Sequence, residues 1–169
     1  FLGNYHDITE RKIANEALRS SQEMLLNSQS VAKICSYSTN LIVTDIDKSQ
    51  WECSPEFYNI FGIDETYPHT IKGWTGFIHP DFREDVVAYH ESVIVEKISF
   101  NREYKIIRIN DGVERWVHGT GKLVYDKDGK PIRMHGAIQD ITEHKQGELE
   151  LKAKNEELIK AKEKAEINE

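Results

Sequence analysis

Residues 136–145 read GAIQDITEHK, and residues 3–12, near the start of the chain, read GNYHDITERK. The two stretches share the glycine, the run Asp-Ile-Thr-Glu and the last lysine, and a charged, helix-favouring stretch follows each copy. We interpret the repeated element as a junction where a β-strand ends and a long helix begins, because an acidic residue at a helix start can accept hydrogen bonds from the free backbone N–H groups. The repeat therefore predicts one complete domain, preceded by the end of a similar domain and followed by an exit helix.

The composition excludes several functional classes. The chain has 169 residues and a net charge of −7, and its basic residues are scattered, which argues against nucleic-acid binding. No apolar run approaches the ~18 residues of a membrane span. The first residue is Phe and no signal peptide is present, so we expect a cytoplasmic fragment of a longer protein that can be membrane-anchored elsewhere. Cys35 and Cys53 are too few for a disulfide scaffold and are expected to be reduced thiols in strands.

Between the two copies, predicted strands and helices are segregated along the chain. Phe82, Val86, Tyr89 and Val93 follow helical spacing and predict a helix over residues 79–97. Asp-Gly pairs at two points between β-rich runs indicate hairpin turns. Residues 33–46 are expected to form a strand or a strand pair, and further strands are expected at residues 51–53, 99–109, 113–125 and 131–141. This order predicts an α+β fold with an antiparallel sheet.

The two long helices carry apolar residues at heptad spacing. Leu18, Leu25 and Ala32 are seven residues apart, as are Leu151, Leu158 and Ala165. An isolated helix with so narrow an apolar stripe is marginal in water. We therefore expect a partner helix from a second copy, in a parallel homodimer.

Several short motifs occur together in one order. They are Trp51 with SPE at 54–56 and IFG at 60–62, Trp74 with IHPD at 78–81, EYKI at 103–106, DG at 111–112 with RWV at 115–117, DGKP at 128–131, and the final junction. Over most of residues 32–145 this series resembles a PAS domain with its PAC motif. The resemblance implies a five-stranded antiparallel sheet with short helices on one face, flanked by long helices. It also implies four segments: the end of a preceding PAS domain (1–7), a linker or signalling helix (8–31), the PAS domain with PAC motif (32–141) and a C-terminal coiled-coil signalling helix (142–169).

The resemblance further implies a non-catalytic sensory and relay module of a multi-PAS sensor histidine kinase in a two-component phosphorelay. Residues 158–166 resemble the linker that enters the dimerisation helices of such kinases. Its partners would be a second copy and the adjacent PAS and kinase domains. The residues expected to transfer the signal are Gly136, Asp140 and Thr142, with Asp7 and Thr9 for the upstream domain. Two alternatives remain open: regulation of a diguanylate cyclase, and a structural dimerisation spacer without a ligand.

Known catalytic and cofactor motifs do not appear. His144 is followed by Lys-Gln-Gly, which does not match the phosphoacceptor box of histidine kinases. The Asn-Cys-Arg-Phe-Leu motif of flavin-binding PAS domains is missing, and no metal site is evident. His90 falls on the helix that carries the haem ligand in haem-binding PAS domains, but flavin and haem are both not expected, and the cofactor is left unknown.

A small apolar pocket between helices and sheet is possible in this fold, with an unidentified small-molecule ligand. Whether side chains or a ligand fill it is left open. The candidate wall residues are Tyr58, Phe61, Phe77, Val86, Tyr104 and Ile106.

Overall fold

The structure is a computed structural model that describes residues 3–42 and 45–167. Its elements, in chain order, are α1 (Gly3–Val31), β1 (Ile34–Asn40), the 3-10 helix η1 (Ile46–Lys48), β2 (Gln50–Cys53), α2 (Glu56–Phe61), α3 (Ile71–Phe77), α4 (Pro80–Glu96), β3 (Phe100–Ile107), β4 (Glu114–Tyr125), β5 (Pro131–Asp140) and α5 (Thr142–Ile167).

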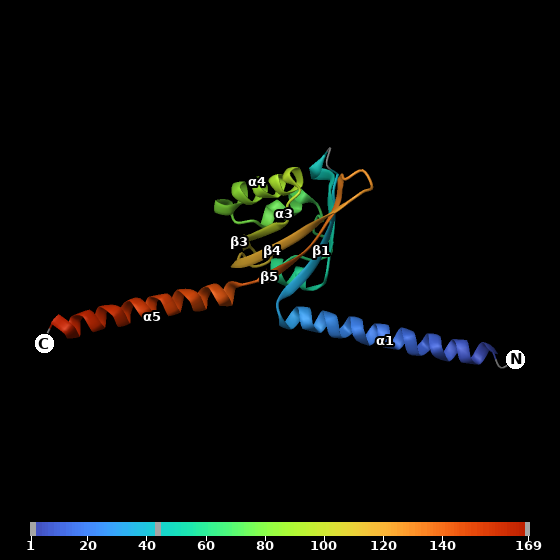
Figure 1. Ribbon diagram of the computed structural model, residues 1–169, viewed down its shortest axis with the longest axis horizontal. Coiled ribbons are helices and arrows are strands. Elements are labelled where there is room, and N and C mark those ends of the chain that lie inside the picture. The colour runs from blue at the N-terminus through green and yellow to red at the C-terminus, as the bar shows by residue number, and fades with distance from the viewer. Residues whose placement is uncertain (1–2, 43–44, 168–169) are drawn as a thin grey trace.

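The strands form one antiparallel sheet in the order β2-β1-β5-β4-β3. Helices α3 and α4 lie over one face of this sheet, and α1 and α5 project from the domain in opposite directions (Figure 1). The first strand pairs with the last, so residues at the entry and exit of the domain become neighbours. The expected α+β fold with a five-stranded antiparallel sheet and flanking helices is confirmed.

The meander β3–β4–β5 forms because two turns have suitable residues. The Asp126 carboxylate accepts hydrogen bonds from the backbone N–H groups of Asp128 (3.0 Å) and Lys130 (2.9 Å). Gly129 has a φ of 75°, which glycine adopts without steric cost. In the β3–β4 turn, Gly112 has a φ of 69° and the Asp111 carboxylate accepts from the N–H of Val113.

The core lies between the sheet and helices α2, α3 and α4. Strand alternation places Phe100, Tyr104 and Ile106 on the buried face of β3. The helices contribute large apolar side chains that are almost fully buried, among them Phe57, Ile60, Phe61, Phe77, Val86 and Val93. The sheet buries one face against these helices.

The stripe predicted for α4 is rotated from its expected orientation. Val86 and Val93 are buried as predicted, but His90 is also buried, with 7% of its surface exposed. Phe82 and Tyr89 are only half-buried. These two rings pack at the margin of the core, where Tyr89 contacts the Arg102 guanidinium.

Two predicted strand boundaries are wrong. The strand expected at residues 33–46 ends at Asn40, and residues 43–44 of that prediction lie outside the described part. Residues 3–7, expected to end a strand, are the first turns of α1, and residues 1–2 are not described. No described strand lies beside residues 3–7 to share a ladder, so helical hydrogen bonds satisfy the backbone there. Their origin in a preceding PAS domain, and the four-segment division, stay predictions.

Candidate functional site

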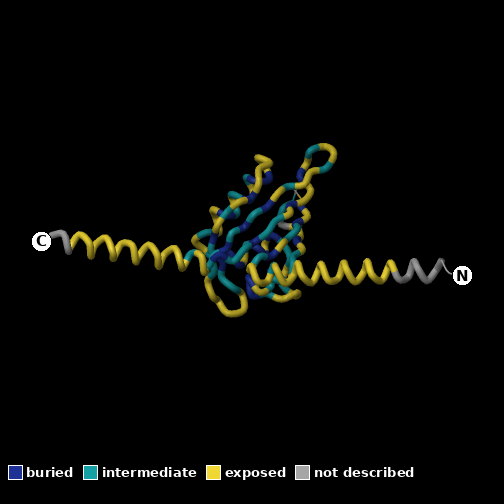
Figure 2. Tube along the Cα trace, turned by 60° about the horizontal axis from the view of Figure 1, so that its bottom comes forward, coloured by how far each residue is buried: buried dark blue, intermediate teal, exposed yellow. Residues whose placement is uncertain are grey.

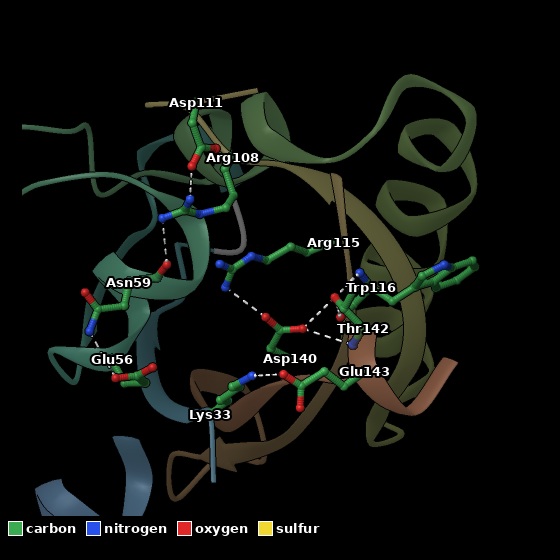
Figure 3. A network of polar contacts seen from close by, with 10 residues as sticks. All are labelled: Lys33, Glu56, Asn59, Arg108, Asp111, Arg115, Trp116, Asp140, Thr142 and Glu143. Carbon is green, nitrogen blue, oxygen red and sulfur yellow. Dashed lines mark hydrogen bonds and ion pairs between the residues drawn. The ribbon is translucent and has the colours of Figure 1, made fainter. Parts of the chain in front are cut away.

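The junction between β5 and α5 is built around the Asp140 carboxylate (Figure 3). One carboxylate oxygen accepts hydrogen bonds from the Thr142 backbone N–H (3.0 Å) and hydroxyl (2.6 Å). The other accepts from the Arg115 guanidinium of β4 at 2.8 Å. Only 7% of the Asp140 side chain is exposed, against 28% for Arg115. The carboxylate therefore satisfies a free N–H group at the start of α5 and ties it to the neighbouring strand.

Thr142 and Ile141 extend this connection into the backbone of β4. The Trp116 backbone N–H donates to the Thr142 hydroxyl at 3.0 Å, and the Ile141 N–H donates to the Trp116 carbonyl at 2.9 Å. The Ile141 carbonyl then accepts from the Lys145 N–H, which starts the helical hydrogen bonding of α5. The first turn of α5 thus continues the hydrogen-bond pattern between β4 and β5.

Lys33 links the end of α1 to the same junction. Its carbonyl accepts from the Asp140 backbone N–H at 2.9 Å, and its ammonium group lies 2.6 Å from the Glu143 carboxylate. The hydrogen bond to Glu143 raises the pKa of Lys33. Lys33 has a φ of 51°, a left-handed conformation that ends α1 and turns the chain into β1. The incoming and outgoing helices therefore share one contact residue, a feature that sequence analysis missed because the contact depends on β1–β5 pairing.

Lys145 joins α5 to the edge strand β3. Its ammonium group lies 2.6 Å from the Glu103 carboxylate and 5.5 Å from the centre of the Trp116 ring. The hydrogen bond between Lys145 and Glu103 lowers the pKa of Glu103 and raises the pKa of Lys145. The Lys145 side chain is 27% exposed and that of Glu103 46%, so solvent screens the ion pair and its energetic contribution is small.

The other predicted signal-transfer residues are placed differently. Gly136 lies within β5, where an added Cβ would stand 1.9 Å from the Thr120 carbonyl and 2.5 Å from the Tyr37 ring. Close packing therefore requires glycine at this position, and its role in signal transfer stays a prediction. Asp7 and Thr9 fall within α1, but their side chains lie outside the described part of the structure. Their role in signal transfer therefore also stays a prediction.

A cavity of about 40 Å³ lies between the sheet and the helices. Its walls are mainly aromatic and aliphatic side chains, including Trp51, Phe57, Trp74, Phe100, Met134 and Ile138. Of the six wall residues predicted from the sequence, only Tyr104 lines it. Phe61, Phe77, Val86 and Ile106 fill the surrounding core, and Tyr58 is half-buried outside it. The cavity is centred further toward β1 and β5 than expected. The alternation of side chains along these two strands is the sequence signal that could have indicated this position.

His90 lines the cavity, and burial lowers the pKa of its imidazole to about 4. The imidazole is therefore neutral near pH 7. A cofactor as large as haem or flavin needs a pocket several-fold larger than 40 Å³.

The two cysteines lie in neighbouring strands as free thiols. Burial raises the pKa of Cys35 to about 12, and its thiol contacts the Ile138 carbonyl at 3.5 Å. Burial also raises the pKa of Cys53. Both thiols are therefore weak nucleophiles near neutral pH.

Residues 3–42 and 45–167 show neither a metal-binding cluster nor a membrane-spanning helix. They contain no group of three or more His, Cys, Asp or Glu side chains arranged to hold a metal ion. No helix within these ranges has the length and apolar character that crossing a bilayer requires.

Comparison with known proteins identifies the fold family. A family model described as the PAS fold matches residues 50–138, more than half of the chain. This chain belongs to the PAS-fold family. Its PAS domain is a sensory, non-catalytic module, as the sequence motifs implied. No match was found among curated proteins.

Several solved structures are similar to this PAS domain. A sensory box histidine kinase/response regulator from Burkholderia thailandensis is 28% identical, with a TM-score of 0.60 over 79% of this chain and 95% of that one. The N-terminal domain of a diguanylate cyclase with PAS/PAC sensor from Marinobacter aquaeolei is 18% identical, with a TM-score of 0.58 over 66% and 97%. A PAS domain from Colwellia psychrerythraea is 11% identical, with a TM-score of 0.54 over 72% and 98%. The last two likenesses concern the fold alone.

Proposed function

We propose that this PAS domain relays a conformational change from α1 to α5 within a cytoplasmic sensor histidine kinase. The observation that carries the proposal is the β5–α5 junction, where Asp140 bonds both the first residue of α5 and Arg115 of β4. A shift of β5 relative to β4 must either move the start of α5 or break these bonds. Because packed helices have discrete arrangements, a small displacement at this point can select between two states of the output helix.

Lys33 provides the input side of this relay. Its carbonyl bonds the Asp140 N–H, and its ammonium pairs with Glu143 on α5. A rotation of α1 therefore acts on the same hydrogen-bond network that positions α5. The upstream and downstream helices thus meet at one end of the inner, paired strands β1 and β5.

A parallel homodimer is part of the proposal. α1 and α5 project from the domain with exposed surfaces (Figure 2). Their heptad leucines are largely uncovered, with exposed fractions of 59% at Leu18, 60% at Leu25, 62% at Leu151 and 63% at Leu158. Long single helices of this kind gain stability from a partner helix, and a second copy supplies an identical stripe in register.

The histidine kinase output is supported by the 28% identity to the Burkholderia protein over most of both chains. The similar diguanylate cyclase PAS domain shares the fold, so a cyclase output is the second candidate. The small size of the internal cavity favours the third, a relay or spacer that operates without a large ligand. The adjacent PAS and kinase domains of the parent chain would be its covalent partners.

The test is kinase regulation in the parent protein carrying Asp140→Ala. We expect kinase activity to persist but to lose its dependence on the upstream input. The matched control is Asp128→Ala, which removes an exposed carboxylate from the β4–β5 turn. Normal regulation in the Asp140 variant, or an equal loss in the Asp128 variant, would contradict the proposed relay.

A further inference from the structure

Helices α4 and α5 begin at the same level of the sheet. The backbone N–H of His79, directly before α4, donates to the Lys105 carbonyl of β3 at 3.0 Å. Lys105 pairs with Trp116 of β4, and the Trp116 carbonyl accepts from the N–H of Ile141, directly before α5, at 2.9 Å. One row of backbone contacts across β3 and β4 therefore connects the start of one helix to the start of the other.

The side chain of Trp116 contacts the same two helix starts. Its half-buried ring packs edge-to-face with the ring of Phe82, in the first turn of α4, with ring centres 5.3 Å apart and an interplanar angle of 79°. The ammonium group of Lys145, in the first turn of α5, lies 5.5 Å from the centre of the Trp116 ring. Figure 3 shows this ring pointing away from Arg115 and Asp140. Trp116 thus meets both helices through contacts that are separate from those of the Asp140 carboxylate.

Phe82 is placed by the residue that caps α4. The His79 imidazole accepts a hydrogen bond from the Asp81 backbone N–H at 3.2 Å, and the His79 carbonyl accepts from the Phe82 N–H at 2.9 Å. Since the His79 N–H also bonds to β3, this one residue ties the first turn of α4 to the edge strand of the sheet. The Phe82 ring therefore moves together with the start of α4.

Lys145 is placed by two contacts of its ammonium group. One is the ion pair with Glu103 at 2.6 Å, and the other is with the ring of Trp116. An ammonium group within about 6 Å of the centre of an indole ring is attracted to the face of that ring. The Lys145 backbone N–H donates to the Ile141 carbonyl at 2.9 Å, which starts the helical hydrogen bonding of α5. A change in the position of the ring therefore reaches the first turn of the output helix.

We propose that Trp116 is a positioning residue that couples the start of α4 to the first turn of α5. The inference rests on the proposed relay function and adds a second input to it, because α4 lies over one face of the sheet whereas α1 enters through Lys33 (Figure 1). A displacement of α4 away from β3 would separate Phe82 from the Trp116 ring. The ring would then turn, and Lys145 would lose one of its two contacts.

Amide hydrogen exchange measured by NMR on the 169-residue protein tests the coupling. Phe82→Leu keeps an apolar side chain but removes the ring edge. We expect it to accelerate exchange of the Lys145 amide at least about threefold relative to the amides of the β4–β5 ladder, since residues in contact are energetically coupled. Tyr89→Leu is the matched control, because Tyr89 is another half-buried aromatic residue of α4 whose ring contacts Phe100. It should leave this ratio unchanged.

Double substitutions test the route. In a protein with Trp116→Leu, Phe82→Leu should no longer change exchange at position 145, because the ring between the two residues is absent. If Trp116→Leu does not fold, Lys145→Met removes the cation at a partly exposed position and should abolish the effect of Phe82→Leu, whereas Lys145→Arg should keep it. An equal acceleration by Tyr89→Leu, no acceleration by Phe82→Leu, or an effect of Phe82→Leu that persists in the Trp116→Leu protein would overturn the proposal.

Two outcomes separate this inference from the relay itself. If Asp140→Ala abolishes regulation of the parent protein while Phe82→Leu leaves exchange of the Lys145 amide unchanged, the relay stands and the second input is refuted. If Phe82→Leu has the expected effect while Asp140→Ala leaves regulation intact, the coupling through Trp116 stands and the relay through Asp140 is refuted.

Discussion

Replacing Asp140 with alanine removes a buried carboxylate that holds two elements together. The substitution eliminates the bonds to the Thr142 N–H and hydroxyl and the ion pair to Arg115. Loss of the cap-like bonds costs about 1 kcal/mol. Breaking a fully buried ion pair costs about 3–5 kcal/mol. The Arg115 side chain is 28% exposed and can be hydrated, so we expect the loss of this ion pair to cost about 1–2 kcal/mol. We expect a total of about 2–3 kcal/mol.

Urea unfolding followed by tryptophan fluorescence measures this change. At about 4 °C for each kcal/mol, the midpoint of thermal unfolding should fall by ~8–12 °C. Asp128→Ala is the control and should stay within about 0.5 kcal/mol of the wild type, as surface substitutions do. Combining Asp140→Ala with Arg115→Ala should cost about 1–2 kcal/mol less than the sum of the single substitutions, because each one already breaks the pair.

The Asp140 carboxylate thus acts as a structural link between β4 and the start of α5. An Asp140→Ala protein that unfolds within about 0.5 kcal/mol of the wild type would refute it, since that value is typical of an exposed side chain without partners. Strict additivity with Arg115→Ala would show that the ion pair contributes nothing in solution.

Three further predictions concern other parts of the molecule. Because the unfolded chain protonates His90 near pH 6.5 and the folded chain only near 4, stability should fall by about 2–3 kcal/mol as the pH drops from 7 to 4.5; His90→Leu should lose much less over the same range in urea titrations. Gly136→Ala should destabilise by about 3 kcal/mol because its Cβ meets the Thr120 carbonyl, whereas Gly147→Ala, in open space on α5, should raise helicity in circular dichroism; a tolerated Gly136→Ala would contradict the packing argument. Leu158→Asp should shift the protein from dimer to monomer in light scattering, and a wild-type monomer at micromolar concentration would remove the dimer proposal.

The sequence predicted the fold well because its signals are local. The Asp-Gly turns define the β3–β4–β5 meander, and the helical spacing in α4 locates that helix correctly. Motif order then placed the domain in its family. The orientation of α4 was less predictable, because the burial of His90 depends on how the helix packs against the sheet and not on its own periodicity.

The candidate site was predicted only in part. Asp140 and Thr142 lie at the junction because the repeated motif specifies the strand end and the helix start together. Arg115 and Lys33 were missed, since they reach the junction through pairing with β5 and through the left-handed turn after α1. Of the predicted wall residues, Tyr104 lines the cavity; the residues of β1 and β5 that also line it reach it through strand pairing, which the short motifs do not specify.

The central claim is that β5 and the start of α5 form one rigid unit, and amide hydrogen exchange tests it most directly. The N–H groups of Ile141, Thr142 and Lys145 bond to Trp116, Asp140 and Ile141, respectively. We predict that these three amides exchange as slowly as those of the β4–β5 ladder, and that Asp140→Ala accelerates them selectively. Exchange at the rate of an unstructured chain in the wild-type protein would contradict the account.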